Sequence, residues 1–298
     1  MVAKPPAKKK LAKVFRCTAC AAPIHLRAPG FTLVIVCEYC KTKMDARDEN
    51  YKILESYKEK TPFQPLIKLG TRGKLLGHKW EVIGFLVRCD KTTVYKWHEY
   101  LLFNPLHGFR WLVLNEGHWS FVKQIRGRIN DSGTLKYGGN TYKQFLTDTA
   151  EVLYVVGEFY WQVKVGSKVT MIDYISPPYM LSLEIEAKEK SWSLGTYIEP
   201  QKVEEAFGIS TFDMPIPRGV GPNQPSPHKG KVSKLLPSTI LAIILVWFVN
   251  TATKSREASN FLFTAILVSA PLIGVWFAHN SAEVKRWENS DFPLTDED

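Results

Sequence analysis

The order of hydrophobic and polar positions divides the chain into a long aromatic-rich region and two apolar runs. Over residues 65–210, short stretches rich in Trp, Tyr, Phe, Val and Ile alternate with Gly, Pro and Asn. That alternation is typical of strands joined by turns. Residues 235–249 and 261–278 contain no charged side chain. The sequence therefore predicts a mainly β domain followed by two apolar helices.

The two apolar runs are predicted to form a transmembrane hairpin over residues 235–279. The second run reaches about 27 Å as a helix, close to the thickness of the bilayer core. The first is shorter and spans only if it extends past Lys234, whose side chain would snorkel. Trp247 and Trp276 suit the lipid interface. The alternative is a helical pair buried in a soluble core, which would require a polar stripe on each helix.

The basic residues that flank these runs predict the orientation in the membrane. Five Lys or Arg residues lie outside the hairpin and two lie in its loop, so both termini are expected in the cytoplasm, at a bacterial inner membrane. Residues 280–298 then form an acidic cytoplasmic tail. The outer residues are Lys229, Lys231, Lys234, Lys285 and Arg286, and the loop residues are Lys254 and Arg256.

Four of the five cysteines form two C-x-x-C pairs near the N-terminus, Cys17 with Cys20 and Cys37 with Cys40. This spacing predicts a zinc ribbon over residues 14–44, with a hairpin between the pairs that turns at Pro29-Gly30. Four thiolates leave no open coordination position, so the zinc is expected to be structural. The alternative, a redox dithiol, would not require a second pair. We interpret His25 as a surface residue and Cys89 as an inert thiol.

Charge and composition define the remaining segments. The formal net charge of the 298 residues is +10, which favours phosphate-bearing partners, either nucleic acid or anionic lipid. Residues 1–13 are expected to be a disordered basic tail that binds anionic lipid, because the membrane anchor keeps lipid close. Residues 45–64 are predicted as a charged, weakly helical linker that separates the ribbon from the β-rich domain, and residues 211–234 as an extended Pro/Gly-rich tether.

A weak internal repeat is present at about residues 66–126 and 142–200. It predicts two related small β units that form a barrel or a sandwich. The landmarks of the first copy are Gly77, Trp80, Gly84, Glu99-Tyr100, Pro105 and Trp119-Ser120. Those of the second are Gly157, Trp161, Gly166, Asp173-Tyr174, Pro178 and Trp192-Ser193.

The segments WHEYLLFNP, GFRWLV, GEFYWQVKVGSKVTMIDYISPPYMLSLE and WSLGTYI resemble the bacterial domain of unknown function 4178. The resemblance covers about residues 66–209. It implies a membrane-associated protein with a ribbon first and helices last, in envelope stress or in the assembly of a membrane complex. No established activity comes with the family.

Potential catalytic groups form no recognisable motif. Four histidines gather in the first repeat without metal-binding helical spacing, and we interpret them as turn and surface residues. They are His78, His98, His107 and His118. The acid-tyrosine pairs, Glu99-Tyr100 and Asp173-Tyr174, are interpreted as structural corners that cap turns. The sequence contains no Walker, nucleophile-elbow or Rossmann motif, so whether the protein is an enzyme is uncertain and the balance is against it.

Three functions are compatible with these features. The leading hypothesis is a non-catalytic, membrane-anchored module that docks a protein partner at the cytoplasmic face. The second is an enzyme or small-ligand binder, for example for a polyamine, with its site between the repeats. Acids that suit such a ligand are Glu99, Glu116, Asp173, Glu184 and Glu186. The third, nucleic-acid binding through the ribbon and basic tail, is unlikely for a protein tethered to a membrane.

Overall fold

The computed structural model describes residues 13–56, 63–127, 129, 135–187, 189–226, 231–252 and 258–292. The chain forms two units, Met1–Arg218 and Gly219–Asp298. The first unit contains the strands and the short helix α1 (Pro200–Phe207), and the second contains α2 (Lys231–Ala252) and α3 (Ala258–Trp287). Most of the predicted basic tail, the loop of the predicted hairpin and the last six residues lie outside the described residues.

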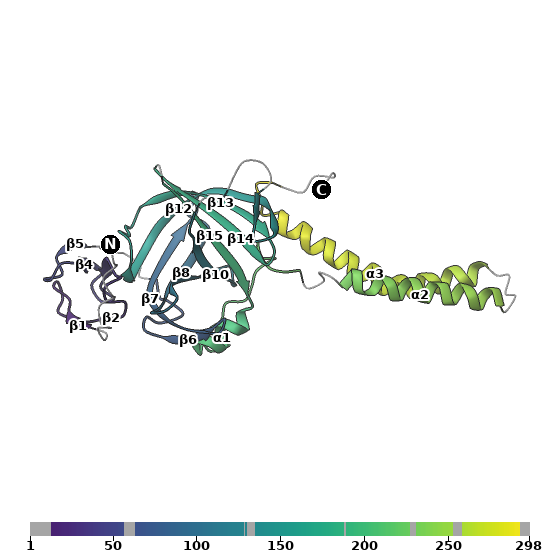
Figure 1. Ribbon diagram of the computed structural model, residues 1–298, viewed down its shortest axis with the longest axis horizontal. Coiled ribbons are helices and arrows are strands. Elements are labelled where there is room, and N and C mark those ends of the chain that lie inside the picture. Colours follow the sequence, from purple (N-terminus) through teal and green to yellow (C-terminus); the bar gives the residue numbers. More distant parts are fainter. Residues whose placement is uncertain are drawn as a thin grey trace, which may run out of the picture. The chain divides into compact units, whose positions relative to one another are not determined.

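Eight antiparallel strands form a closed barrel in the first unit (Figure 1). Two four-stranded meanders build it, and they join because β10 pairs with β15 and β7 pairs with β12. The first meander comprises β7 (His78–Cys89), β8 (Lys96–Asn104), β9 (Gly108–Asn115) and β10 (His118–Ile125). The second comprises β12 (Asn140–Phe159), β13 (Lys168–Ser176), β14 (Tyr179–Glu186) and β15 (Glu189–Ile198). The mainly β prediction is confirmed, and of its two options the structure has the barrel.

An approximate two-fold relation connects the two meanders. The rings of Tyr100 and Trp119 are 5.9 Å apart, and those of Tyr174 and Trp192 are also 5.9 Å apart. Trp119 pairs with Ile198 across the β10–β15 ladder, and Trp192 pairs with Ile125 in the same ladder. The Tyr and Trp landmarks of the repeat therefore occupy corresponding strands.

The glycine landmarks do not correspond in the way the sequence predicted. Gly77 precedes β7, whereas Gly157 lies within β12 and Gly166 lies in the loop after it. The structural counterpart of Gly157 is Gly84, which sits directly opposite it in the β7–β12 ladder. The reason is that close approach of two strands requires a glycine on each, a constraint that a list of matched glycines cannot reveal.

Two of the apolar clusters combine residues of the barrel strands with residues of α1 or β11. The larger cluster includes Tyr100 and Trp119 and is covered by Val203 and Phe207 of α1, close to the short strand β6 (Arg72–Leu75). The other includes Leu181 and Trp192 and is covered by β11 (Leu135–Tyr137) together with the first half of β12.

The N-terminal strands differ from the predicted ribbon hairpin. β1 (Lys13–Arg16) pairs with β2 (Pro23–Leu26), whereas β3 (Val34–Val36) pairs with β4 (Thr42–Asp45) and with β12. No hairpin therefore turns at Pro29-Gly30. The weak helix expected for the linker is also wrong where the structure describes it, because β5 (Ile53–Ser56) pairs with β4. The second half of the ribbon, β3 and β4, thus continues the sheet of the barrel, whereas β1 and β2 form a separate two-stranded sheet.

The second unit is a pair of packed helices, α2 and α3. Leu262–Trp287 is a stretch of 26 residues that is long and apolar enough to cross a membrane. Its most apolar segment of 18 residues contains no buried residue. The apolar part of α2, Lys234–Val249, is shorter. Arg286 is fully buried and donates hydrogen bonds of 2.8 Å to the carbonyl oxygens of Gly221 and Pro222. Part of the predicted tether is therefore held against the end of α3.

Candidate metal centre and barrel interior

The four predicted ligands lie on two knuckles of the same local geometry, one between β1 and β2 and the other between β3 and β4. In the first knuckle the carbonyl oxygen of Cys17 accepts from the amide of Ala21, at 2.8 Å, and in the second that of Cys37 accepts from Lys41, at 3.1 Å. Ala21 and Lys41 each have a φ of 59°. Each C-x-x-C segment is therefore followed by a left-handed residue that turns the chain back, which leaves the two sulfurs of the segment on one side of the turn.

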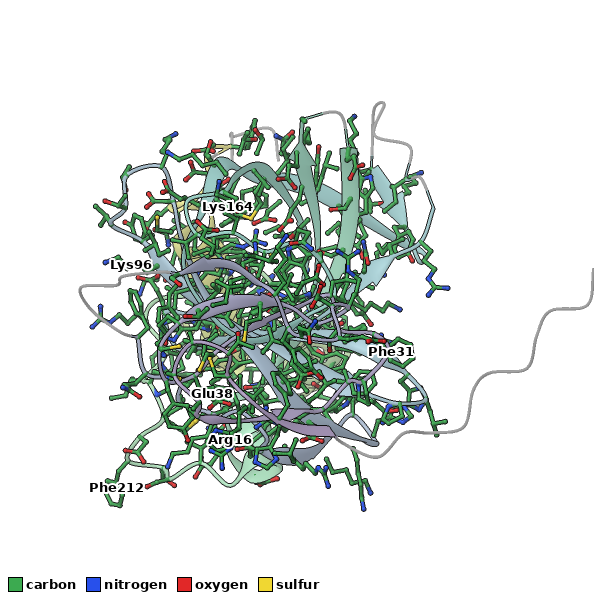
Figure 2. All side chains as sticks on the ribbon, turned by 90° about the vertical axis from the view of Figure 1, so that its left-hand side faces the viewer. Arg16, Phe31, Glu38, Lys96, Lys164 and Phe212 are labelled. Carbon is green, nitrogen blue, oxygen red and sulfur yellow. The ribbon has the colours of Figure 1, made fainter. Side chains whose placement is uncertain are left out.

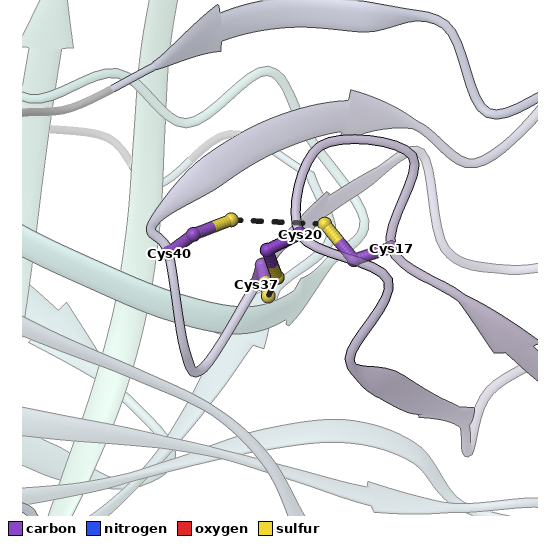
Figure 3. Close-up of side chains that lie close together, drawn as sticks. All are labelled: Cys17, Cys20, Cys37 and Cys40. Atoms are coloured by element: carbon purple, nitrogen blue, oxygen red, sulfur yellow. Dashed lines mark hydrogen bonds between the residues drawn. The ribbon is translucent and has the colours of Figure 1, made fainter.

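The sulfurs are spaced like the corners of a tetrahedron (Figure 3). Cys17 Sγ and Cys40 Sγ are 3.7 Å apart, Cys20 Sγ and Cys37 Sγ are 3.8 Å apart, and all four lie within 4.8 Å of one another. Four sulfurs at about 2.3 Å from a central zinc ion would be separated by about 3.8 Å. The spacing therefore fits one metal ion with four thiolate ligands.

The environments of the thiols are unequal. Burial raises the pKa of Cys17, and it raises the pKa of Cys37 to about 12. Burial also acts on Cys40, but hydrogen bonds with Thr42 and with the thiols of Cys20 and Cys17 together outweigh it and lower the pKa of Cys40 to about 6. The amide of Tyr39 points at Cys37 Sγ, at 3.4 Å. Because a metal ion binds thiolates, loading the site must release a proton from at least the Cys37 thiol at neutral pH.

A buried carboxylate joins this centre to the barrel. Glu158 of β12 is 1% exposed and accepts hydrogen bonds from the amides of Arg27 and Ala28 and from Thr32 Oγ1, at 2.6, 3.0 and 2.8 Å. Burial raises the pKa of Glu158, and these three donors oppose that rise. The loop between the knuckles is therefore fixed to β12, contrary to the prediction that a linker separates ribbon from barrel.

A second polar group lies inside the barrel. Arg88 Nη1 of β7 donates to Glu184 Oε1 of β14, at 2.8 Å, although β12 and β13 separate these strands in the sheet. Such a contact is possible only across the interior of the closed barrel. Arg88 Nε lies 3.4 Å from Glu99 Oε1, which also accepts from Trp97 Nε1 at 2.8 Å. Arg88, Glu99 and Glu184 therefore point inward.

Asp173 belongs to the same interior group. Asp173 lies on β13 directly opposite Ser182 of β14. Glu184 follows Ser182 by two residues, so its side chain lies on the same face of the sheet as Asp173. Asp173 is 7% exposed, and its Oδ1 atom has no hydrogen-bond partner among the described residues. Burial and the nearby charge of Glu184 raise the pKa of Asp173 to about 6, against a hydrogen bond with Ser182 that lowers it.

These positions correct the interpretation of the acid-tyrosine pairs. Glu99 and Asp173 lie within strands β8 and β13, so they cap no turn. Successive side chains of a strand point to opposite faces, which places the acids inside the barrel and the tyrosines outside. Tyr100 accepts a hydrogen bond from the amide of Leu66 on the outer side, at 3.1 Å.

Three of the five acids proposed for a cationic ligand are thus brought together, namely Glu99, Asp173 and Glu184. Glu186 lies at the end of β14, and its charge reaches Arg88. Glu116 is elsewhere, exposed in the turn between β9 and β10.

Aromatic side chains pack beside this polar group. The rings of Trp111 and Trp161 are 5.3 Å apart, and those of Phe109 and Tyr160 are 4.5 Å apart. Tyr160 forms a hydrogen bond with Trp111, and the charges of Glu184, Glu99 and Arg88 act on its hydroxyl. Sequence reasoning missed Arg88 and Tyr160. One signal was available in the sequence of β8, where Trp97 and Glu99 lie two residues apart. This spacing places both side chains on one face of the strand and indicates a polar group on that face.

The histidines do not form a shared site. The rings of His78 and His107 are 3.9 Å apart on exposed residues, and His98 packs against Phe85. His118 is buried, with ring nitrogens 3.3 Å from Tyr197 Oη and 3.0 Å from the carbonyl oxygen of Arg218, so its assignment to the surface was wrong.

The other singled-out residues are structural or exposed. Cys89 is buried and burial raises its pKa, as expected for an inert thiol. Trp119 and Trp192 are buried core residues, so neither can anchor a docked partner. The exposed aromatic residues include Tyr39, at 68%, and Phe212, at 100%. Figure 2 shows Phe212 at the lower edge of the view, pointing away from the barrel.

Comparisons with known proteins support the resemblance of the barrel region. The family model described as "Domain of unknown function (DUF4178)" matches residues 68–200. The match begins before β7 and ends with the last strand of the barrel, so it covers both meanders and leaves out the cysteine knuckles and the helical pair. The search of curated proteins and the search of solved structures found no match.

Proposed function

We propose that the protein is a non-catalytic docking module anchored at the cytoplasmic face of a bacterial inner membrane. In this proposal α2 and α3 cross the bilayer as a hairpin with both chain termini in the cytoplasm. The ribbon and the barrel belong to one compact unit, and this unit recruits a protein partner.

The observation that carries the proposal is the uncovered apolar surface of α3. The most apolar 18 residues of Leu262–Trp287 are not buried against any other part of the described chain. A helix that is apolar on all sides is stable only where lipid or protein covers it. Trp276 and Lys285 suit an end at the lipid interface.

The metal centre supports a structural role for zinc in this module. Four cysteine ligands leave no position for a substrate or water, and cysteine-rich tetrahedral sites favour zinc. The exposed side chains of Tyr39 and Phe212 provide aromatic surface of the kind found at the centre of protein interfaces.

Membrane fractionation tests the anchor. Full-length protein should stay in the membrane pellet after carbonate extraction, and a chain ending before residue 235 should be soluble. A matched variant with Leu267→Asp in α3 should be partly extracted, because a carboxylate at the middle of a span costs a few kcal/mol. Release of the full-length chain by carbonate would exclude a transmembrane hairpin. Docking is tested separately by crosslinking the metal-loaded, membrane-embedded protein to its partner. Phe212→Ser should give less crosslinked product than wild type. Leu106→Ser, which changes another exposed apolar residue, is the control and should give as much as wild type.

A further inference from the structure

The interior polar group of the barrel has more negative than positive charge. It contains one guanidinium, that of Arg88, and three carboxylates, those of Glu99, Asp173 and Glu184. Placing like charges in a poorly solvated interior is unfavourable unless a proton or a cation compensates them. The group therefore lacks positive charge.

The missing charge has a defined position. Glu184 is engaged by Arg88, and Glu99 lies between Arg88 and the donor Trp97 Nε1. By contrast, Asp173 Oδ1 is buried and accepts no hydrogen bond in the described structure. A buried acceptor without a donor destabilises the folded state. A group that brings N–H donors and a positive charge to Asp173 would remove this cost.

The interior group is accessible from one side. The side chain of Glu184 is 34% exposed, whereas those of Arg88 and Glu99 are 11% and 12% exposed. Glu186 follows at the exposed end of β14. A row of carboxylates therefore leads from solvent to Asp173, and such a row attracts cations.

The geometry favours an organic cation over a metal ion. Within the described part of the chain, the four cysteines are the only set of three or more potential ligands whose ligating atoms all lie within 4.8 Å of one another. The interior carboxylates therefore do not form a cluster of three ligands around one point. An ammonium group needs only separate hydrogen bonds, and it is stabilised by aromatic faces such as that of Tyr160.

We propose that the barrel binds the ammonium group of a primary amine at Asp173, with Glu184 and Glu99 contributing negative charge and Tyr160 an aromatic wall. The carbon chain of the amine runs outward past Glu184 and Glu186. This site goes beyond the proposed docking function and does not depend on the membrane anchor. It also accounts for a buried acid that otherwise only destabilises the fold, a pattern typical of functional sites.

Titration with small amines tests the site in the full-length, metal-loaded protein in detergent. Propylamine should bind in calorimetry and raise the melting temperature, and propanol, which has the same shape without the charge, should do neither. Asp173→Asn should weaken amine binding about tenfold or more, because it removes a charge-assisted hydrogen bond. Glu99→Gln should weaken it less.

The matched control is Glu151→Gln, which removes a carboxylate that is ion-paired with Lys168 at 3.0 Å. Lys168 lies on the same strand as Asp173, five residues before it, and its side chain therefore points to the opposite face of the sheet. This variant should bind propylamine like wild type. Equal effects of propylamine and propanol, absence of amine binding at millimolar concentration, or unchanged binding by a folded Asp173→Asn variant would each overturn the proposal. Circular dichroism and metal content establish that the variants are folded.

Discussion

Gly84 and Gly157 face each other where the first and second halves of the barrel meet. A Cβ atom on Gly84 would lie 2.6 Å from the carbonyl oxygen of Glu158, and one on Gly157 would lie 2.4 Å from that of Ile83. Both distances are shorter than any normal contact with backbone, which cannot move without separating the strands. Closure of the barrel therefore depends on the absence of side chains at this pair.

Gly84→Ala should destabilise the protein by about 2–4 kcal/mol, because the added methyl group forces the β7–β12 ladder apart. Denaturant unfolding followed by tryptophan fluorescence measures this change. Gly195→Ala is the control, since Gly195 is also in a barrel strand and the nearest atom to its Cβ would be 3.5 Å away. Equal stability of the two variants would show that the ladder can open without cost.

The features that sequence could predict depend on local pattern. The two C-x-x-C pairs, the mainly β region and the apolar helices all follow from spacing or periodicity within a short window. The inward acids were named from composition, but their convergence could not be predicted. Glu99 and Glu184 lie on strands whose separation around the barrel is fixed only by closure, and closure depends on Gly84 and Gly157.

The link between ribbon and barrel was missed for a related reason. The pairing of β3 with β12 joins residues more than one hundred positions apart, and the charged composition of residues 45–64 suggested a separator. In the sequence, nothing distinguishes Glu158 from the other acidic residues of the predicted strands. Only the fold places it under the Arg27–Thr32 loop.

The metal centre predicts one bound zinc ion per chain. Replacing Cys17, Cys20, Cys37 and Cys40 together by Ser should abolish zinc binding. Elemental analysis of purified protein measures the stoichiometry. Cys89→Ser should retain the metal, because Cys89 lies apart from the cluster. Zinc content that is unchanged in the quadruple variant would contradict the assignment. Metal affinity should also rise with pH as the Cys37 thiol loses its proton.

Glu158→Gln should destabilise both ribbon and barrel by about 2–4 kcal/mol, since an amide has one acceptor oxygen for three buried donors. Hydrogen exchange should show faster exchange in β3 and at the end of β12. Glu49→Gln, at an exposed position in the turn between β4 and β5, is the control and should have little effect. Loss of protection confined to the knuckles would mean that ribbon and barrel fold independently.

Membrane topology can be tested by cysteine labelling in whole cells. A cysteine at Ser255, between the two apolar helices, should react with an impermeant maleimide, and a cysteine at Ser290, after α3, should react only after the membrane is permeabilised. The excess of Lys and Arg outside the predicted hairpin is the physical reason. The opposite labelling pattern would reverse the orientation, and labelling of both sites would exclude a hairpin.

Asp173→Asn should stabilise the amine-free protein at neutral pH, although it removes a charged group. Burial raises the pKa of Asp173 from an ordinary value of 3.8 to about 6, so the folded state binds more protons than the unfolded state between these values. The free energy of unfolding therefore falls as the pH rises through this window, and above it the ionised carboxylate costs about 2–3 kcal/mol. Asparagine is never ionised and avoids that cost, so the gain should be present at pH 7.5 and absent near pH 4. Thermal unfolding at several pH values measures it, and Asp148→Asn, which removes an ion pair with Lys91 at 3.8 Å, should show no such gain. A loss of stability at pH 7.5 would mean that the Asp173 carboxylate is compensated in the free protein and that no cation is missing.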